Sequence, residues 1–234
     1  MKRAILIVLT LCLLAGTAAC GGSNRTTQST AETAAPTAAP VQDTASVQPT
    51  TAPDEGPTEE TTAGSHILVA YFSLANEQYE VGVIEKGNTQ IVAEFIADAT
   101  GADTFKIEST EEYPTTYDGL LEVSRQEEND PPQIAETVEN MDGYDTIFLG
   151  YPIWWGDLPT IVKVFLQSYD FTGKTIVPFC THAGSGLSGT PGTIEDICPD
   201  ASVGEGLAIR GSTAQNDQDS AAQSVESWLA DGYS

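Results

Sequence analysis

The chain has 234 residues, of which 34 are Asp or Glu and 9 are Lys or Arg, so its formal net charge is -25 at pH 7. A charge this acidic argues against nucleic-acid binding, because neutralising phosphates requires a basic face. It favours a soluble surface and protein partners whose own surface is basic. The four cysteines include no Cys-x-x-Cys pair, so their spacing does not indicate a metal site.

The N-terminus has the layout of a secretory signal. Two basic residues precede an apolar run over residues 4–16, which is short for a transmembrane helix of about 20 residues. The small residues that end in Cys20 resemble a bacterial lipoprotein signal, which implies a signal peptide over residues 1–19 and a lipid on the Cys20 thiol. We therefore expect an extracytoplasmic protein that contacts the membrane through its lipid anchor only. Thr17 stands where that family prefers Leu, so an ordinary signal peptide cleaved near Ala19 is the alternative.

Residues 20–65 are rich in Thr, Ala, Pro and Ser and poor in large apolar residues. Such a segment cannot bury enough surface to offset its chain entropy, so we predict a disordered tether. A flexible chain of this length has a root-mean-square reach of about 35–40 Å. The tether is long enough to hold a domain, residues 66–234, clear of a membrane surface.

From His66 onward the sequence alternates between strand and helix patterns. In chain order the apolar spacing predicts strand 67–72, helix 88–100, strand 103–107, a weaker helix or loop over 113–127, strand 146–150, helix 158–169, strand 175–180, a short helix 193–197, strand 203–209 and helix 216–229. Thr193 is the expected cap of the short helix, with Asp196 at the reciprocal position.

Five alternations of this kind predict an α/β fold, a doubly wound five-stranded parallel sheet with helices on both faces. Ligands of such sheets bind beyond the carboxyl ends of the strands, where the strand order reverses. The loops after the first, third and fourth strands are therefore the candidate site.

The loop after the first strand begins at Ser73 and ends at Gly87, Asn88 and Thr89, where a helix starts. A helix N-terminus offers unpaired N–H groups and the positive end of a dipole, which suit a phosphate. The alternative is that Asn88 or Thr89 only caps the helix.

The loop after the third strand runs from Pro152 through Ile153, Trp154 and Trp155 to Gly156. Neighbouring side chains at a strand end point in different directions, so at most one Trp is expected in the core. Flat aromatic rings at a crevice suit stacking on a planar ligand. The alternative is one core Trp and one surface Trp without a ligand.

The loop after the fourth strand is rich in small residues. It runs Thr181, His182, Ala183, Gly184, Ser185, Gly186. Small residues allow the backbone to approach a ligand closely, although an ordinary flexible loop has the same composition.

Taken together, these three loops resemble the flavodoxin-like family, in its branch with paired Trp and a Thr-His-x-Gly-Ser-Gly loop. The resemblance covers about residues 66–231. It implies strand order 2-1-3-4-5 and noncovalent binding of FMN. It further implies that Ser73, Asn88 and Thr89 hold the FMN phosphate, that Pro152, Ile153, Trp154, Trp155 and Gly156 line one side of the flavin ring, and that Thr181, His182, Gly184, Ser185 and Gly186 reach its other edge.

One departure from the family pattern concerns the phosphate loop. The family has a compact Ser/Thr-x-Thr-Gly-x-Thr loop, whereas here residues 74–86 separate Ser73 from Gly87. We interpret 74–86 as an insertion that serves as a lid or as a partner contact.

The resemblance implies that FMN carries the redox chemistry while the protein supplies binding and electrostatics. Stacked aromatic rings and an acidic surround disfavour the anionic reduced flavin. We therefore expect a low-potential one-electron carrier whose redox partner has a basic surface, with no residue assigned as catalytic.

Two other functions stay open. One is an FMN-dependent NAD(P)H quinone or nitro reductase, because the fold hosts both roles, and His182 would then donate a proton or a hydrogen bond. The other is a lipoprotein that binds a small ligand or a partner without flavin. Cys180 and Cys198 either form a disulfide, as is common outside the cytoplasm, or pack as two buried thiols.

Overall fold

A computed structural model describes residues 66–233. The predicted signal peptide, the lipidation site Cys20 and the tether lie outside the described residues. No helix between residues 66 and 233 has the length and apolar character needed to cross a bilayer.

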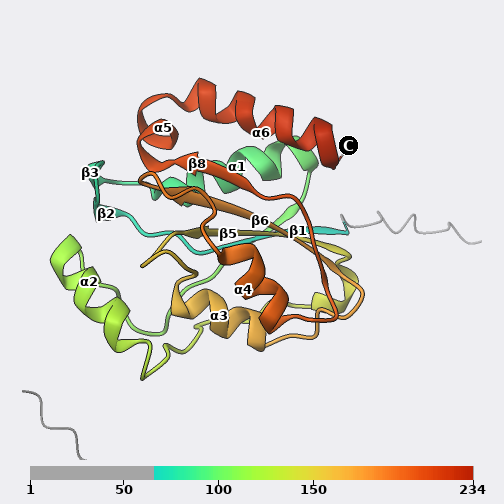
Figure 1. Cartoon of the computed structure of the whole chain (residues 1–234), viewed down its shortest axis with the longest axis horizontal. Helices are drawn as coiled ribbons and strands as arrows, with labels where there is room; N and C mark the ends of the chain where they lie inside the picture. Colours follow the sequence, from blue (N-terminus) through green and yellow to red (C-terminus); the bar gives the residue numbers. More distant parts are fainter. Residues whose placement is uncertain (1–65, 234) are drawn as a thin grey trace, which may run out of the picture. The chain divides into compact units, whose positions relative to one another are not determined.

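The centre of the domain is a parallel sheet (Figure 1). Its strands run in the order β4-β1-β5-β6, and β7 and β8 both pair with β6. Their bounds are β1 Ile67–Tyr71, β4 Asp103–Lys106, β5 Thr146–Pro152, β6 Thr175–His182, β7 Ser202–Val203 and β8 Leu207–Arg210. The predicted order 2-1-3-4-5 is confirmed, with β7 and β8 as two pieces of the fifth strand.

The fifth strand is interrupted beside a proline in its neighbour. β7 pairs with Thr175 and Ile176, whereas β8 pairs with β6 from Phe179 onward. Pro178 lies between these two stretches and has no N–H to donate to a ladder. At Gly206 a Cβ atom would lie 2.7 Å from the Leu187 side chain and 3.0 Å from Pro178, so the chain passes too close there for a larger residue.

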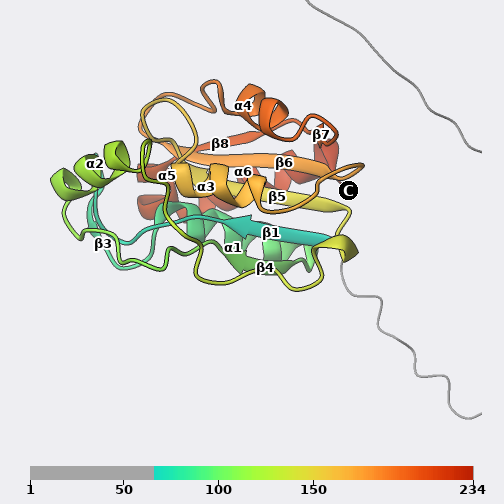
Figure 2. The ribbon, with the colours of Figure 1, turned by 90° about the horizontal axis from the view of Figure 1, so that it is seen from below.

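Helices cover both faces of the sheet (Figures 1 and 2). Alternate residues of β1 separate the two cores: Leu68 packs in the cluster that includes α3 and α4, and Val69 packs in the cluster that includes α1 and α6. The helices are α1 Asn88–Thr100, α2 Tyr117–Gln126, α3 Thr160–Gln167, α4 Thr190–Ile197, α5 Gly211–Asn216 and α6 Gln218–Gly232, with a short 3-10 turn, η1, over Met141–Gly143.

The insertion forms a structure that the sequence patterns did not indicate. β2 (Asn76–Gln78) and β3 (Gly82–Ile84) pair as an antiparallel hairpin. In both views this hairpin and α2 lie at the same end of the sheet (Figures 1 and 2).

Three predicted helix starts were wrong. The helix α3 begins at Thr160, after Pro159, and not at residue 158. The helix α4 begins at Thr190 after Gly189, with a proline in its first turn, because proline suits the first helical position. Thr193 is therefore inside α4 and does not cap it. The closing helix begins at Gln218, where the Asp217 side chain accepts from the Ser220 N–H, and the separate helix α5 precedes it.

Cys180 and Cys198 are both free and buried, so the structure favours two packed thiols over a disulfide. Burial raises the pKa of both thiols, that of Cys180 to about 12. Both therefore remain protonated and unreactive at neutral pH.

Candidate functional site

A cleft opens at the carboxyl ends of β1, β5 and β6. It gathers residues from all three predicted loops, from the insertion, from α2 and from the start of α5. Its lining residues are Gln78, Tyr79, Glu80, Val81, Asn88, Tyr117, Leu120, Leu121, Ser124, Pro152, Ile153, Trp154, Trp155, Thr181, His182, Ala183, Gly211 and Ser212. Of the predicted site residues, Ser73, Thr89, Gly156, Gly184, Ser185 and Gly186 lie outside this lining.

Two of the predicted phosphate-binding hydroxyls have hydrogen-bond partners within the protein. Ser73 Oγ accepts from the Gln90 N–H at 3.0 Å and so caps the first turn of α1. Thr89 Oγ1 lies 2.8 Å from Thr181 Oγ1 in a buried hydrogen bond. At Gly87 a Cβ atom would lie 2.2 Å from Ser73 Oγ, so only glycine lets the loop approach the serine this closely. These hydroxyls shape the loop, and the first N–H groups of α1 have no partner within the helix.

Asn88 differs from these two residues because it lines the cleft and also has a polar atom without a partner. Its Oδ1 is buried and has no hydrogen-bond partner in the structure. Its amide lies against Gly211, where a Cβ atom would come within 2.6 Å of Nδ2. A buried acceptor without a donor costs about 1–3 kcal/mol, and a donor that reached Asn88 Oδ1 would relieve that cost.

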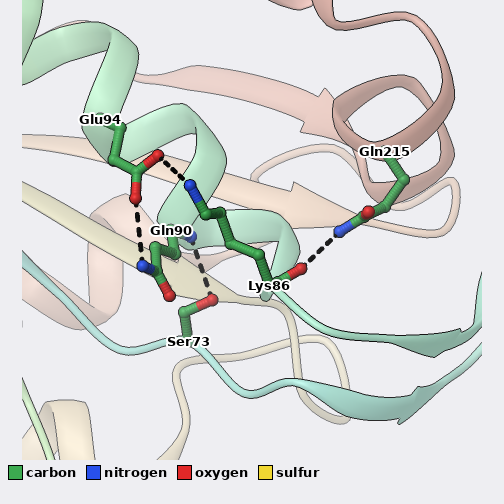
Figure 3. A network of polar contacts seen from close by, with 5 residues as sticks. All are labelled: Ser73, Lys86, Gln90, Glu94 and Gln215. Atoms are coloured by element: carbon green, nitrogen blue, oxygen red, sulfur yellow. Dashed lines mark hydrogen bonds and ion pairs between the residues drawn. The ribbon is translucent and has the colours of Figure 1, made fainter.

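The exit of the insertion is tied to α1 and α5 (Figure 3). Lys86 Nζ contacts Glu94 Oε2 at 2.7 Å, and Gln90 Nε2 donates to the other Glu94 oxygen at 3.1 Å. Gln215 Nε2 donates to the Lys86 carbonyl at 2.6 Å. This network fixes the chain where it enters α1 and therefore fixes the position of Asn88.

The paired Trp residues lie on a tight turn. Trp154 and Asp157 exchange backbone hydrogen bonds of 3.0 and 2.9 Å, with Trp155 and Gly156 at the corner. Both corner residues have positive φ, 53° and 81°. A bulky residue rarely adopts this conformation, and such positions cluster at functional sites.

Asp157 anchors this turn to two helices. Its Oδ2 contacts Lys163 Nζ at 2.7 Å on α3, and its Oδ1 accepts from Thr193 Oγ1 at 2.8 Å on α4. Burial alone would raise the pKa of Asp157, but the hydrogen bonds from Lys163, Leu158 and Thr193 outweigh it and lower that pKa.

The two Trp rings have different environments. Trp154 is half-buried, with its ring centroid 5.4 Å from that of Phe72 and 5.9 Å from that of Tyr113. Trp155 is 54 % exposed. Its Nε1 donates to Ser124 Oγ at 3.0 Å, and the Arg125 guanidinium lies 4.2 Å from its ring centroid. Two α2 residues thus hold an exposed aromatic ring at the cleft.

His182 is held by the loop that follows it. Its Nδ1 accepts from the Gly184 N–H at 2.8 Å. Arg210 Nη1 donates to the Ala183 carbonyl at 3.2 Å. Burial, and secondly the charge of Arg210, lower the pKa of His182. The ring is therefore neutral at pH 7.

The hairpin and α2 form an outer wall of the cleft. Tyr79 stacks on Tyr117 with ring centroids 5.5 Å apart and planes inclined by 29°. The Tyr117 N–H donates to Glu77 Oε2 at 2.9 Å, which joins the hairpin to the first residue of α2. Residues 211–212 carried no sequence signal for a site, whereas residues 78–81 belong to the insertion that the sequence indicated as a lid or a partner contact. The α2 residues did carry one, because Tyr117, Leu120, Leu121 and Ser124 follow the i, i+3, i+4, i+7 spacing of one helix face.

The family model described as Flavodoxin matches residues 66–226. The chain belongs to the flavodoxin family. Within residues 66–233, no three His, Cys, Asp or Glu side chains come together as metal ligands.

Two solved structures from Bacteroides are similar to this flavodoxin-family chain. A candidate flavoprotein from Bacteroides eggerthii is 30 % identical, with a TM-score of 0.56, over 72 % of this chain and 98 % of its own. A second, from Bacteroides uniformis, is 25 % identical, with a TM-score of 0.54, over 70 % of this chain and 99 % of its own. A comparison with curated proteins gives no match.

Proposed function

We propose that the cleft binds FMN noncovalently and that the protein is an extracytoplasmic electron carrier. The observation that carries the proposal is Asn88, a residue that lines the cleft and whose buried Oδ1 has no partner in the protein. A flavin and its ribityl chain carry N–H and O–H donors that such an atom accepts. Membership of the flavodoxin family makes a flavin the ligand to test first.

The residues around the cleft fit FMN. The N–H groups at the start of α1 suit its phosphate, and they need no lysine or arginine because the helix dipole favours an anion there. The exposed Trp155 ring suits stacking on the flavin ring, and the loop from Thr181 to Ala183 also lines the cleft. When bound, FMN would supply one- and two-electron redox chemistry.

Carrier function is favoured over an NAD(P)H-dependent enzyme by the charge of the cleft. Within the part of the chain that the structure describes, no Lys or Arg lines the cleft, and Glu80 is its one carboxylate. A dinucleotide brings further phosphates, which would find no cation in the lining. The Arg125 guanidinium is engaged on the Trp155 ring, 4.2 Å from its centroid.

A reductase of small flat compounds is the second candidate. The stacked pair Tyr79 and Tyr117 supports it, because the pair adds an aromatic wall outside the motif loops. Steady NAD(P)H oxidation by the purified protein with a quinone or nitro compound, and without another reductase, would favour this candidate over a carrier.

The carrier proposal includes a membrane location and a basic redox partner. The lipoprotein-like signal ending at Cys20 supports the location, and the net charge of -25 supports a basic partner. Metabolic labelling with a radioactive or alkynyl fatty acid tests the anchor: the label should enter the wild-type protein and be absent from Cys20→Ala. Label in both variants, or in neither, would contradict the anchor.

The decisive experiment for the site is a titration of the purified protein with FMN. We expect the flavin absorbance bands to shift and the flavin fluorescence to fall as the complex forms. Asn88→Ala should weaken FMN binding by about fivefold or more, the cost of one hydrogen bond. Asn216→Ala, an exposed residue at the end of α5 outside the cleft, is the matched control and should bind as the wild type does. A protein that leaves the FMN spectrum unchanged would support the non-flavin alternative.

A further inference from the structure

The two ring nitrogens of His182 have different roles: Nδ1 is engaged in a hydrogen bond within the protein, and Nε2 can bond to a ligand. Nδ1 accepts the Gly184 N–H at 2.8 Å, and a ring nitrogen that accepts carries no proton. The neutral imidazole then carries its proton on Nε2. Since His182 lines the cleft, Nε2–H is the polar group that its ring can offer to a ligand there.

The loop that imposes this tautomer depends on glycine. Gly184 has φ +142°, a backbone conformation that residues with side chains rarely adopt. This conformation turns the Gly184 N–H back toward the histidine ring. A Cβ atom at Gly184 would also lie 3.6 Å from a guanidinium nitrogen of Arg210, so the loop, the histidine and Arg210 are packed as a unit.

Arg210 supports this arrangement in two ways. Its Nη1 donates to the carbonyl of Ala183, which holds the loop at the end of β8. Its positive charge also opposes a second positive charge on the neighbouring imidazole, and it lowers the pKa of His182 together with burial. The other ionisable groups that line the cleft are Glu80 and Tyr79 on the hairpin and Tyr117 on α2.

We infer that Arg210 is a positioning residue that holds the 182–184 loop so that His182 Nδ1 accepts the Gly184 N–H, and that His182 therefore offers Nε2–H as a hydrogen-bond donor to the bound flavin and is not its proton donor. This inference rests on the proposed FMN site for the identity of the acceptor. The state of the histidine itself is a property of the protein and can be measured without a ligand.

The first experiment measures that state in the protein without FMN. The chain has two histidines, so His66→Gln leaves His182 as the single imidazole in a nitrogen-15 NMR spectrum. In this background we expect the Nε2–H tautomer and a His182 pKa below the ordinary value of about 6.5. Arg210→Gln should raise the pKa toward that value, and Arg210→Lys, which keeps the charge, should leave it lower. A His182 that titrates at or above the ordinary value, or that Arg210→Gln does not move, would overturn the inference.

The second experiment asks whether the donor reaches the flavin. His182→Phe removes the donor and should weaken binding about fivefold or more, whereas His182→Gln offers an amide N–H and should recover part of the loss.

The two experiments separate the possible failures. If the wild type binds no FMN, the proposed function fails and so does the assignment of the flavin as acceptor, whatever the NMR spectrum shows. If FMN binds but His182→Phe binds it as tightly as the wild type, the proposed function survives and this inference is wrong. A circular dichroism spectrum and an unfolding curve for each variant show whether it is folded under the conditions of the titration.

Discussion

Thr89 Oγ1 and Thr181 Oγ1 lie 2.8 Å apart and join the first turn of α1 to the end of β6 across 92 positions of sequence. The two residues are 1 % and 2 % exposed. The bond therefore fixes the first and fourth strand loops relative to each other beneath the cleft, where water cannot replace it.

This pair predicts a non-additive double-mutant cycle. Thr89→Val leaves the buried Thr181 hydroxyl without a partner and should lower the free energy of unfolding by about 1–3 kcal/mol. Thr181→Val should cost a similar amount for the same reason. The double variant should lose less than the sum of the two, because two apolar groups of the same shape need no partner. Urea unfolding measures all three, and strictly additive losses would contradict the pairing.

Substitution of the two Trp residues should have separate effects, one on FMN binding and the other on the stability of the fold. Trp155 is mostly exposed, so Trp155→Ala should weaken FMN binding about tenfold, a loss of about 1.4 kcal/mol, and change the unfolding free energy little. Trp154 packs on Phe72 and Tyr113, so Trp154→Ala should destabilise the fold by about 2–3 kcal/mol. Paired FMN titrations and urea unfolding test both variants. A large loss of stability in Trp155→Ala would show that the ring is structural.

Asp157 predicts a defined pH dependence of stability. Its pKa is lower in the folded protein than in the unfolded chain, so the unfolded state binds the proton more readily. The stabilisation is fully present above the unfolded pKa of about 3.8 and is lost as the pH falls through the folded pKa. Asp157→Asn should lower Tm by roughly 2 °C at pH 7, because the group is partly exposed and its ion pair with Lys163 is screened. The difference from the wild type should shrink below about pH 4. Calorimetry across this range checks the prediction, and a constant difference would contradict it.

The hairpin should control how fast FMN leaves the cleft. Tyr79→Ala removes the ring that stacks on Tyr117, so the FMN dissociation rate should rise about threefold to tenfold, at a cost of about 0.5–1.5 kcal/mol for an aromatic pair. Val83→Ala is the matched control, because Val83 lies on the same hairpin, is 83 % exposed and does not line the cleft. Stopped-flow flavin fluorescence measures both rates. Equal FMN dissociation rates in the two variants would show that the hairpin is not part of the FMN site.

Most of the sheet could be predicted from the sequence, because its central strands are buried on both faces. Strands covered on both faces are continuous apolar runs, and Ile147 to Leu149 and Ile176 to Val177 are fully buried. The hairpin could not be predicted, because residues 76–84 pair only with each other and two of their long side chains, Tyr79 and Val83, face solvent. Its strands therefore lack the alternation of a half-buried sheet.

The candidate site was predictable in its loops and not in its individual hydrogen bonds. The three motif loops do meet at one cleft, and Asn88, Trp155 and His182 line it. The roles of Ser73 and Thr89 depended on tertiary partners, the Gln90 N–H and the Thr181 hydroxyl, that no local pattern specifies. Thr193 looked like a cap for the same reason, since its partner Asp157 is 36 positions away.

The interrupted fifth strand bears on how copies of this domain behave when many are held close together. An outer strand with a long row of free N–H and C=O groups is a template on which another chain can add a strand. Here that row is divided into pieces of two and four residues by the passage beside Pro178. This break in the fifth strand thus shortens the outer edge of the sheet and lowers the risk that neighbouring copies join edge to edge.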